Sequence, residues 1–189
     1  DSFIEVMTTV EHLKYMCNHA PLILSQEKRS PGIFIHKRAY IRYFPHGTAG
    51  IISPWNYPLI LTASPVVEAL LSGNTVVLKP SELTPLTGNK IRQIFIDGGI
   101  PKEVFQIVHG FGDIGAAIVE SPMTDIICFT GSVKVGRAIA EACGKQLKPS
   151  ILELGGSDPM IILEDADLDR SISAAVWGGF SNCGQTCIS

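Results

Sequence analysis

The chain has 189 residues, of which 46% are hydrophobic and 17% charged, a composition typical of a well-packed folded protein and not of a disordered one. Its 15 basic and 18 acidic residues give a formal net charge of −3 with no basic block, which argues against nucleic acid as a partner. The most apolar stretch, residues 58–73, is interrupted by Pro65 and Glu68, so we expect no membrane-spanning helix and no membrane partner.

Cysteine usage favours a reducing compartment. The chain has 5 cysteines, an odd number, and their irregular spacing is unlike a disulfide framework. No charged segment followed by an apolar one, as in a secretory signal, opens the sequence. We therefore expect a cytoplasmic protein.

A helix and then strands are predicted before residue 47. Over residues 2–19, apolar side chains recur at helical intervals and predict an amphipathic helix. Between Gly32 and Phe44, β-branched and aromatic residues alternate and predict one or two strands. The residues that carry these patterns are Phe3, Met7, Val10, Leu13 and Cys17 for the helix, and Ile33, Ile35, Ile41 and Tyr43 for the strands.

From Gly50 onward, short apolar runs alternate with helical segments. Runs of Val, Ile and Leu without polar alternation are typical of strands buried on both faces, and strand–helix repeats predict a parallel sheet whose strands end at a common ligand-binding edge. The predicted strands are 49–53, 75–79, 104–109, 126–129 and 150–154, and the predicted helices are 59–72, 87–97, 115–120, 133–143 and 168–179.

Four motifs occur at the ends of these strands, and the fourth is paired with a segment that follows the last predicted helix. They are Ile52-Ser53-Pro54-Trp55-Asn56-Tyr57-Pro58, then Lys79-Pro80-Ser81-Glu82, then Phe129-Thr130-Gly131-Ser132-Val133-Lys134-Val135-Gly136, and finally Leu152-Glu153-Leu154-Gly155-Gly156 together with Gly184-Gln185-Thr186-Cys187. In this order and spacing, the sequence from about residue 42 to 189 resembles the aldehyde dehydrogenase superfamily.

The resemblance implies an α/β fold with a Rossmann-like parallel sheet. It divides the chain into an N-terminal helix with oligomerisation-type strands (1–46), an NAD-binding domain (47–154) and the start of a catalytic domain (155–189). Family chains are well over twice this length, so we expect this sequence to be a part that stops just after the catalytic cysteine. The resemblance also implies a homodimer or homotetramer of the intact protein.

Cys187 matches the nucleophile of the family. Hydride leaves readily only from a carbon that bears an oxyanion, and attack by a thiolate on an aldehyde forms such an adduct and then a thioester. An isolated cysteine is more often a buried core residue. The Gly-Gln-x-Cys setting and the upstream motifs favour the catalytic interpretation.

Asn56 and Glu153 match the other two catalytic positions. The Asn56 amide, with the backbone N–H of Cys187, corresponds to the oxyanion hole; the alternative is an asparagine that only shapes a turn. Glu153 corresponds to the base that activates water to hydrolyse the thioester, and we expect burial beside Leu152 and Leu154 to bring its pKa near the working pH. The alternative is an exposed strand-end carboxylate.

The remaining motif residues correspond to the cofactor site of the family. Lys79 and Glu82 match the pair that holds the adenosine ribose, and a carboxylate there favours NAD, with NADP as the alternative. The alternative for Lys79 is a solvated strand end. Ser132, at the start of a helix, matches a pyrophosphate contact. The other predicted cofactor residues are Ile52, Ser53, Pro54, Trp55, Ser81, Gly110, Gly112, Gly115, Phe129, Thr130, Gly131, Leu154 and Gly155.

The remaining cysteines are predicted to be packing residues: Cys17, Cys128 and Cys143. Cys183 lies four residues before Cys187, a spacing that suggests an oxidative link between the two thiols. No histidine or further cysteine lies near them with ligand spacing, so no metal site is expected.

The resemblance therefore implies an oxidoreductase that converts a small-molecule aldehyde into a carboxylic acid with NAD(P). Two alternatives stay open. One is an acylating dehydrogenase that passes the thioester to coenzyme A, and the other is a catalytically incomplete nucleotide-binding fragment.

Overall fold

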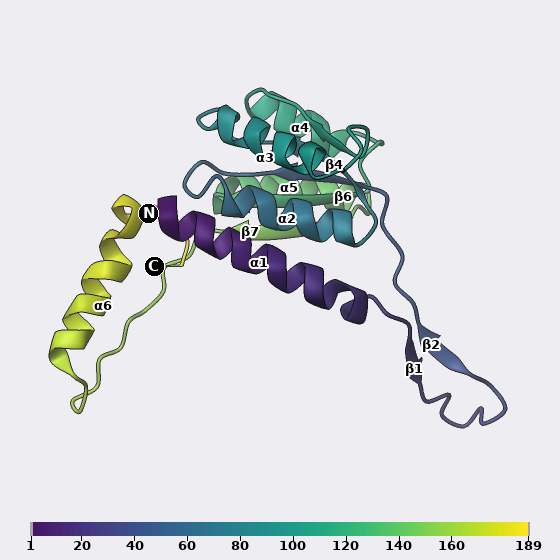
Figure 1. Cartoon of the computed structure of the whole chain (residues 1–189), viewed down its shortest axis with the longest axis horizontal. Coiled ribbons are helices and arrows are strands. Elements are labelled where there is room, and N and C mark those ends of the chain that lie inside the picture. The colour runs from purple at the N-terminus through teal and green to yellow at the C-terminus, as the bar shows by residue number, and fades with distance from the viewer. Residues whose placement is uncertain (1, 189) are drawn as a thin grey trace.

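The computed structural model describes residues 2–188 and has a five-stranded parallel sheet as its centre (Figure 1). Residues 1 and 189, the outer ends of the first and third predicted segments, lie outside the described residues. The strand order is β5-β4-β3-β6-β7. The strands are β3 (Thr48–Ile52), β4 (Thr75–Lys79), β5 (Phe105–Ile107), β6 (Ile126–Gly131) and β7 (Ser150–Leu154). The predicted Rossmann-like α/β fold is confirmed, with strand bounds within two residues of those expected.

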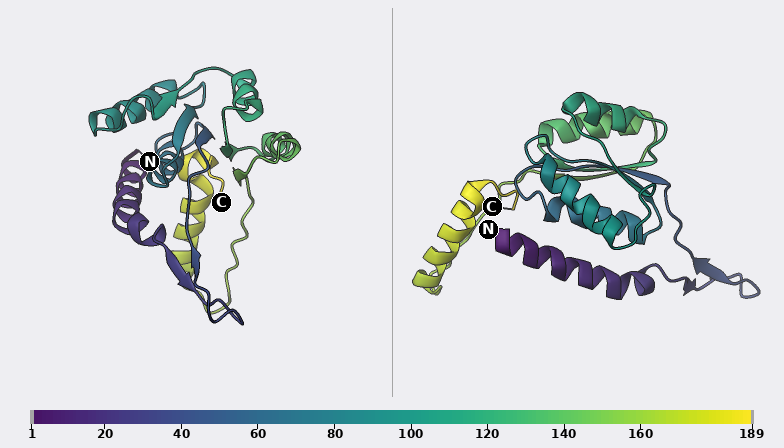
Figure 2. Two further views of the ribbon diagram at one scale, coloured as in Figure 1. Left: turned by 90° about the vertical axis from the view of Figure 1, so that its right-hand side faces the viewer. Right: turned by 45° about the horizontal axis from the view of Figure 1, so that its top comes forward.

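Helices cover both faces of the sheet (Figure 2). On one face, α2 (Ile60–Leu71) and α3 (Pro85–Asp97) close a core that includes Val66, Ile91 and Phe105. On the other face, α4 (Gly112–Glu120) and α5 (Val133–Lys145) close a second core that includes Ile118 and Ile139. This double layer explains the apolar runs of the central strands, because both of their faces are buried.

Gly50, in the middle of β3, leaves no room for a side chain. A Cβ atom built there would lie 2.7 Å from Ile118 Cγ2 and 2.9 Å from Ile127 Cδ1. We expect Gly50→Ala to lower the free energy of unfolding by about 1–3 kcal/mol, the usual cost of overpacking a core. Gly144→Ala is the control, since a Cβ there meets nothing within 4 Å, and it should stabilise α5 by up to about 1 kcal/mol. Urea unfolding measures both, and equal midpoints would contradict the prediction.

The first helix, α1 (Ser2–Ile23), packs on α2 with a different face from the one predicted. Phe3 and Met7, part of the predicted apolar stripe, are 73% and 50% exposed, whereas Thr9 and Ala20 are buried. Cys17 is also exposed, so its prediction as a packing residue is wrong. The helix turns its more polar face to α2 because polar side chains there bond directly to α2, as described below.

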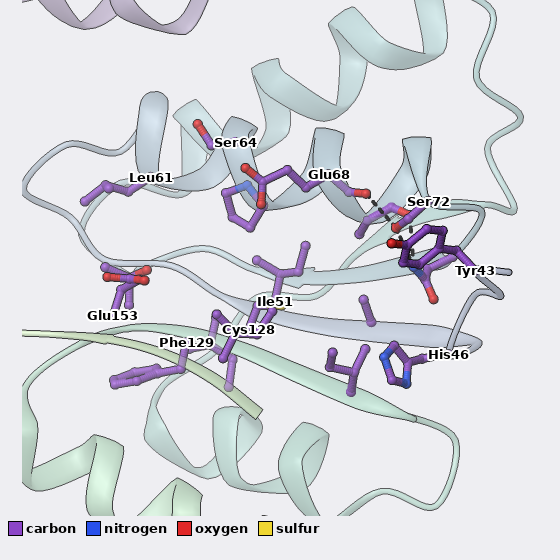
Figure 3. A pocket seen from close by; sticks show the side chains of 18 of the residues that line it. Tyr43, His46, Ile51, Leu61, Ser64, Glu68, Ser72, Cys128, Phe129 and Glu153 are labelled. Carbon is purple, nitrogen blue, oxygen red and sulfur yellow. Dashed lines mark hydrogen bonds between the residues drawn. The ribbon is translucent and has the colours of Figure 1, made fainter. Parts of the chain in front are cut away.

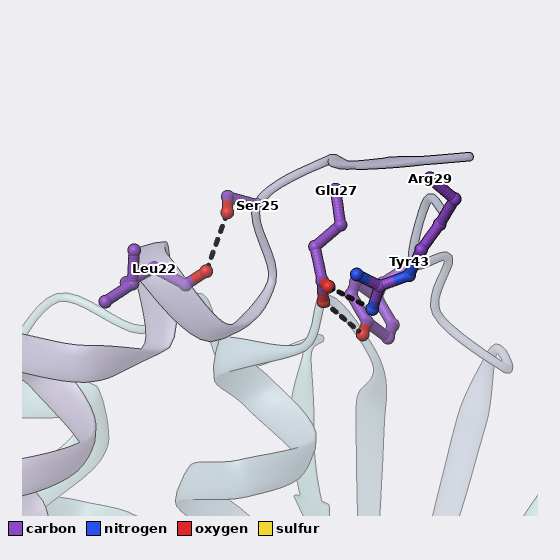
Figure 4. A network of polar contacts seen from close by, with 5 residues as sticks. All are labelled: Leu22, Ser25, Glu27, Arg29 and Tyr43. Atoms are coloured by element: carbon purple, nitrogen blue, oxygen red, sulfur yellow. Dashed lines mark hydrogen bonds and ion pairs between the residues drawn. The ribbon is translucent and has the colours of Figure 1, made fainter. Parts of the chain in front are cut away.

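The segment after α1 forms a two-stranded antiparallel sheet of β1 (Glu27–Arg29) and β2 (Ala39–Ile41) that extends away from the main sheet. The predicted strand region, 32–44, contains β2 but misses β1. Pro31 and Gly32, whose φ is +61°, break the extended backbone, and turns follow through residue 37. Glu27 connects β1 to the segment after β2 by accepting a 3.0 Å hydrogen bond from Tyr43 Oη, and its carboxylate also contacts Arg29 on the same strand (Figure 4).

The last elements are α6 (Leu168–Phe180) and the short 3₁₀ helix η1 (Ser181–Gly184). Figure 1 shows α6 standing apart from the sheet, and none of its described side chains is buried. The Asp167 carboxylate caps its first turn by accepting from Arg170 N at 3.1 Å. In η1, Asn182 and Cys183 have φ values of +51° and +56°, which turn the chain back toward the sheet.

Among residues 2–188, no helix has the length and apolar character that crossing a bilayer requires.

Candidate active site

The four motifs meet at one edge of the sheet, as expected for the carboxyl ends of parallel strands. Ile52 pairs with both Lys79 and Phe129, and Gly131 pairs with Leu154. Beyond β3, Ser53 N donates to Lys79 O at 3.1 Å, and the buried Ser53 hydroxyl accepts from Thr62 Oγ1 at 2.7 Å. These bonds fix the start of the loop 54–58.

Asn56 connects this loop to the segment that carries Cys187. Its side-chain Nδ2 donates to the carbonyl oxygen of Gln185 at 2.9 Å, and Asn182 Nδ2 donates in return to the Asn56 carbonyl at 2.9 Å. Next to them, Tyr57 Oη lies 3.3 Å from Thr186 Oγ1. An amide nitrogen carries two hydrogens, so the bond to Gln185 leaves one for a second acceptor.

Cys187 is half-buried, and its backbone lies against the segment that follows β7. A Cβ atom built on Gly156 would lie 3.0 Å from the Cys187 carbonyl oxygen. The closeness of the two backbones therefore depends on a glycine at this position. The structure thus brings the segments of Asn56, Glu153 and Cys187 to one place.

Glu153 is exposed, and the expectation that it is buried beside Leu152 and Leu154 is wrong. Successive side chains of a strand point to opposite faces. The two leucines pack against the α4 and α5 core, whereas Glu153 and Ile151 point to the α2 face. That face is uncovered beside β7, the edge strand of the sheet.

Glu153 lines one end of a cavity of about 500 Å³ between α2 and strands β3, β6 and β7 (Figure 3). Cys128 and Phe129 line the floor on β6, and Ser64 lies opposite on α2. Asn56 and Cys187 are not among the lining residues. The cavity therefore adjoins the site at Glu153 but does not contain it.

Lys79 is only 4% exposed, which rules out the solvated strand end. Its ammonium group lies 3.5 Å from Glu82 Oε2 and donates to Pro80 O at 3.3 Å. Gly115 packs on its stem, since a Cβ there would lie 3.8 Å from Lys79 Cδ. A buried charge with so few partners, next to an exposed carboxylate, is suited to bind hydroxyl groups of a ligand.

Ser132 caps α5, with its hydroxyl accepting from Val135 N at 3.3 Å. It is exposed, so the N-terminus of α5 faces the edge where the strands end. Gly112 and Gly155 have open space where a Cβ would stand. Pro54 and Thr130 are half-buried, and Trp55 is 44% exposed and therefore not a core residue. This open polar edge fits a dinucleotide, whose pyrophosphate a helix N-terminus attracts.

All five cysteines are free thiols, and their environments differ. Cys143 is buried, as predicted, and Cys128 is half-buried on β6. Burial raises the pKa of the Cys128 thiol to about 11 and also raises that of Cys143. Cys183 is exposed. A link between Cys183 and Cys187 stays a prediction.

We expect iodoacetamide at pH 8 to label Cys183 much faster than Cys128. A rise in pKa from 9.0 to about 11 leaves about 100-fold less thiolate, the reactive form. Because the folded-state pKa is the higher one, the contribution of Cys128 to stability is complete below pH 9 and is lost as the pH rises toward 11. Peptide mass spectrometry measures the labelling, and equal rates at pH 8 would contradict the assignment.

Within the described part of the chain, no group of three or more His, Cys, Asp or Glu side chains is placed to hold a metal ion. The sequence interpretation did not single out Asn182, Gln185, Tyr57 or Thr186. Their contacts cross more than 120 positions of sequence. In the sequence, their position inside or next to the motifs was the only feature that pointed to the site.

The profile of the aldehyde dehydrogenase family matches residues 1–189. The chain is 40% identical over 187 residues to the 4,4'-diapolycopene aldehyde oxidase of Methylomonas sp, covering 98% of the chain and 35% of that protein. It is 46% identical over 145 residues to the benzaldehyde dehydrogenase [NAD(+)] of Pseudomonas putida, covering 76% of the chain and 30% of that protein. The crystal structure of an NAD-dependent aldehyde dehydrogenase from Sinorhizobium meliloti superposes with a TM-score of 0.92 at 38% identity, covering 98% of this chain and 37% of that one.

The chain thus belongs to the aldehyde dehydrogenase family. It spans about a third of the length of these relatives.

Proposed function

We propose that the protein containing this chain oxidises an aldehyde to a carboxylic acid with NAD, through a thioester on Cys187. The observation that supports the proposal is the pair of hydrogen bonds that joins Asn56 to Asn182 and Gln185, in the segment that carries the half-buried Cys187. A thiol nucleophile and a fixed amide donor are the two groups that formation of a tetrahedral adduct requires.

In this mechanism Cys187 attacks the aldehyde carbon as its thiolate, and the resulting oxyanion accepts from Asn56 Nδ2 and from the backbone N–H of Cys187. NAD, when bound, would accept the hydride. Glu153 then takes a proton from the water that attacks the thioester, and the Cys187 thiolate leaves as the carboxylic acid forms. The exposure of Glu153 leaves it accessible to water, and it lies on the strand that leads to Gly156, whose backbone approaches Cys187.

The residues proposed to hold NAD line the edge where the strands end. Lys79 and Glu82 bind ribose hydroxyls, and Ser132 with the first turn of α5 binds the pyrophosphate, where the Ser132 hydroxyl is exposed. The other residues proposed to surround the cofactor are Ile52, Ser53, Pro54, Trp55, Ser81, Gly110, Gly112, Gly115, Phe129, Thr130, Gly131, Leu154 and Gly155.

Three broader features belong to the same proposal. The segments 1–46, 47–154 and 155–189 act as oligomerisation, cofactor-binding and catalytic parts. The protruding β1–β2 pair supports a homodimer or homotetramer. The five free thiols support a cytoplasmic location.

The test is NADH formation by the full-length protein with a panel of aromatic and aliphatic aldehydes, together with identification of the product. A carboxylic acid supports the proposal. An acyl-CoA formed only when coenzyme A is added would show an acylating dehydrogenase instead. NAD binding without turnover would show a nucleotide-binding protein without this chemistry.

We expect Glu82→Gln to shift the cofactor preference toward NADP. The Glu82 carboxylate is exposed near Lys79, and a negative charge there repels a 2′-phosphate. Removing it should raise the ratio of kcat/KM for NADP to that for NAD about tenfold, equivalent to about 1.4 kcal/mol. Glu103→Gln, at an exposed position next to Lys102, is the control. If the ratio of kcat/KM for NADP to that for NAD is unchanged in Glu82→Gln, the adenosine ribose of the cofactor does not bind at Glu82.

A further inference from the structure

Glu5, on α1, supplies the cap that α2 lacks. Its Oε1 atom accepts hydrogen bonds from the backbone N–H groups of Leu59 at 2.6 Å and Ile60 at 3.1 Å. Leu59 stands at the N-cap position of α2 and offers no side-chain acceptor. The first N–H groups of a helix have no partner within the helix and carry partial positive charge. A carboxylate from a neighbouring helix therefore satisfies them.

Other residues of α1 lie on the same face as Glu5. The Glu5 carbonyl oxygen accepts from Oγ1 of Thr9 at 2.7 Å, and Thr9 is buried one turn along the face of α1 that contacts α2. Further along the same face, His12 Nε2 lies 3.2 Å from Glu68 Oε1, a contact that is an ion pair only when His12 is protonated. The Glu5 bonds are thus the hydrogen bonds that join this face of α1 to α2, and the His12–Glu68 contact, in which His12 Nε2 makes no hydrogen bond, adds to them only when His12 is charged.

The cap lies three residues after Asn56. The loop 54–58 is fixed at its start by Ser53, which bonds to Lys79 O and Thr62. Glu5 fixes its other end through Leu59 and Ile60. Between these two anchors, the Asn56 side chain points to the Gln185 carbonyl. A shift of the α2 N-terminus would therefore move Asn56 relative to Cys187.

We propose that Glu5 is a positioning residue for the reaction, because its carboxylate fixes the N-terminus of α2 and thereby aims the Asn56 amide at the oxygen of the Cys187 adduct. This inference rests on the proposed function. It adds to that function a residue that touches neither substrate nor cofactor and lies on a helix outside the four motifs.

The test compares Glu5→Ala, Glu5→Gln, Asn56→Ala and the double variant Glu5→Ala/Asn56→Ala in the full-length protein. Glu5→Ala should lower kcat about 10- to 100-fold, since small displacements of an oxyanion donor are costly, while the Kd for NAD stays within about twofold. Glu5→Gln should restore most of kcat, because its amide oxygen accepts the same two bonds. The double variant should be no slower than Asn56→Ala, because Glu5 acts through Asn56.

Glu11→Ala is the matched control, since Glu11 lies on the exposed side of the same helix and its carboxylate accepts from Lys14. Additive losses in the double variant, or an equal loss in Glu11→Ala, would overturn the proposal.

Hydrogen–deuterium exchange gives a readout that does not need activity. Glu5→Ala should speed exchange in residues 55–60 and also in 182–187, and Glu11→Ala should change neither segment. If exchange becomes faster only in residues 55–60, Glu5 caps α2 without positioning the Cys187 segment, and the proposal is overturned. Absence of NADH formation by the unmodified protein would refute the proposed function. Hydrogen–deuterium exchange in residues 182–187 would still test whether Glu5 positions this segment, because it does not depend on activity.

Discussion

Cys187→Ala should abolish aldehyde-dependent NADH formation, lowering kcat at least about 10⁴-fold, the scale seen when a covalent nucleophile is removed. Without the sulfur, no tetrahedral adduct forms and the hydride has no oxyanion to drive it out. NAD binding should persist, because the proposed ribose site at Lys79 and Glu82 is built from β4 and the turn that follows it.

The control is Cys183→Ser, which changes the exposed neighbouring thiol and should keep most of the activity. Acid quenching during turnover, followed by peptide mass spectrometry, should find the acyl group on the Cys187 peptide of the unmodified protein. An acyl group on another residue, or turnover retained in Cys187→Ala, would refute the assignment of the nucleophile.

Asn56→Ala should lower kcat about 10²- to 10³-fold, equivalent to roughly 2.7–4 kcal/mol for one oxyanion donor. The KM for the aldehyde should change much less, because the donor acts on charge that develops only during the reaction. Steady-state kinetics with saturating NAD measures both constants.

Two further variants separate chemistry from structure. Asn182→Ala removes the bond to the Asn56 carbonyl but keeps the Asn56 amide. It should therefore lower kcat less than Asn56→Ala does. Asn89→Ala, at an exposed asparagine whose side chain hydrogen-bonds to His109, should leave kcat unchanged. A loss below about threefold in Asn56→Ala would exclude a donor role of the size typical for an oxyanion hole.

Much of the fold was predictable because its signals are local. Apolar runs such as Thr75–Lys79 and Ser150–Leu154 were predicted with the bounds observed. Turn residues and caps mark the strand ends, and the motif order indicated the family that the comparisons confirm. The strands β1 and β2 were harder to predict from the sequence, because each has only three residues. Three residues are too few for a periodic pattern to locate a strand.

Tertiary structure decided the environment of each side chain in the site. The sequence by itself determined that Asn56, Lys79 and Glu153 lie at strand ends and that Cys187 follows the last helix. It did not determine that Lys79 is buried, that Glu153 faces the uncovered side of β7, or that α1 turns Glu5 toward α2. The physical reason is separation along the chain. The Glu5–Leu59 and Asn56–Gln185 bonds join residues 54 and 129 positions apart, and only the packing of α1 on α2 and the return of the chain after α6 bring those partners together.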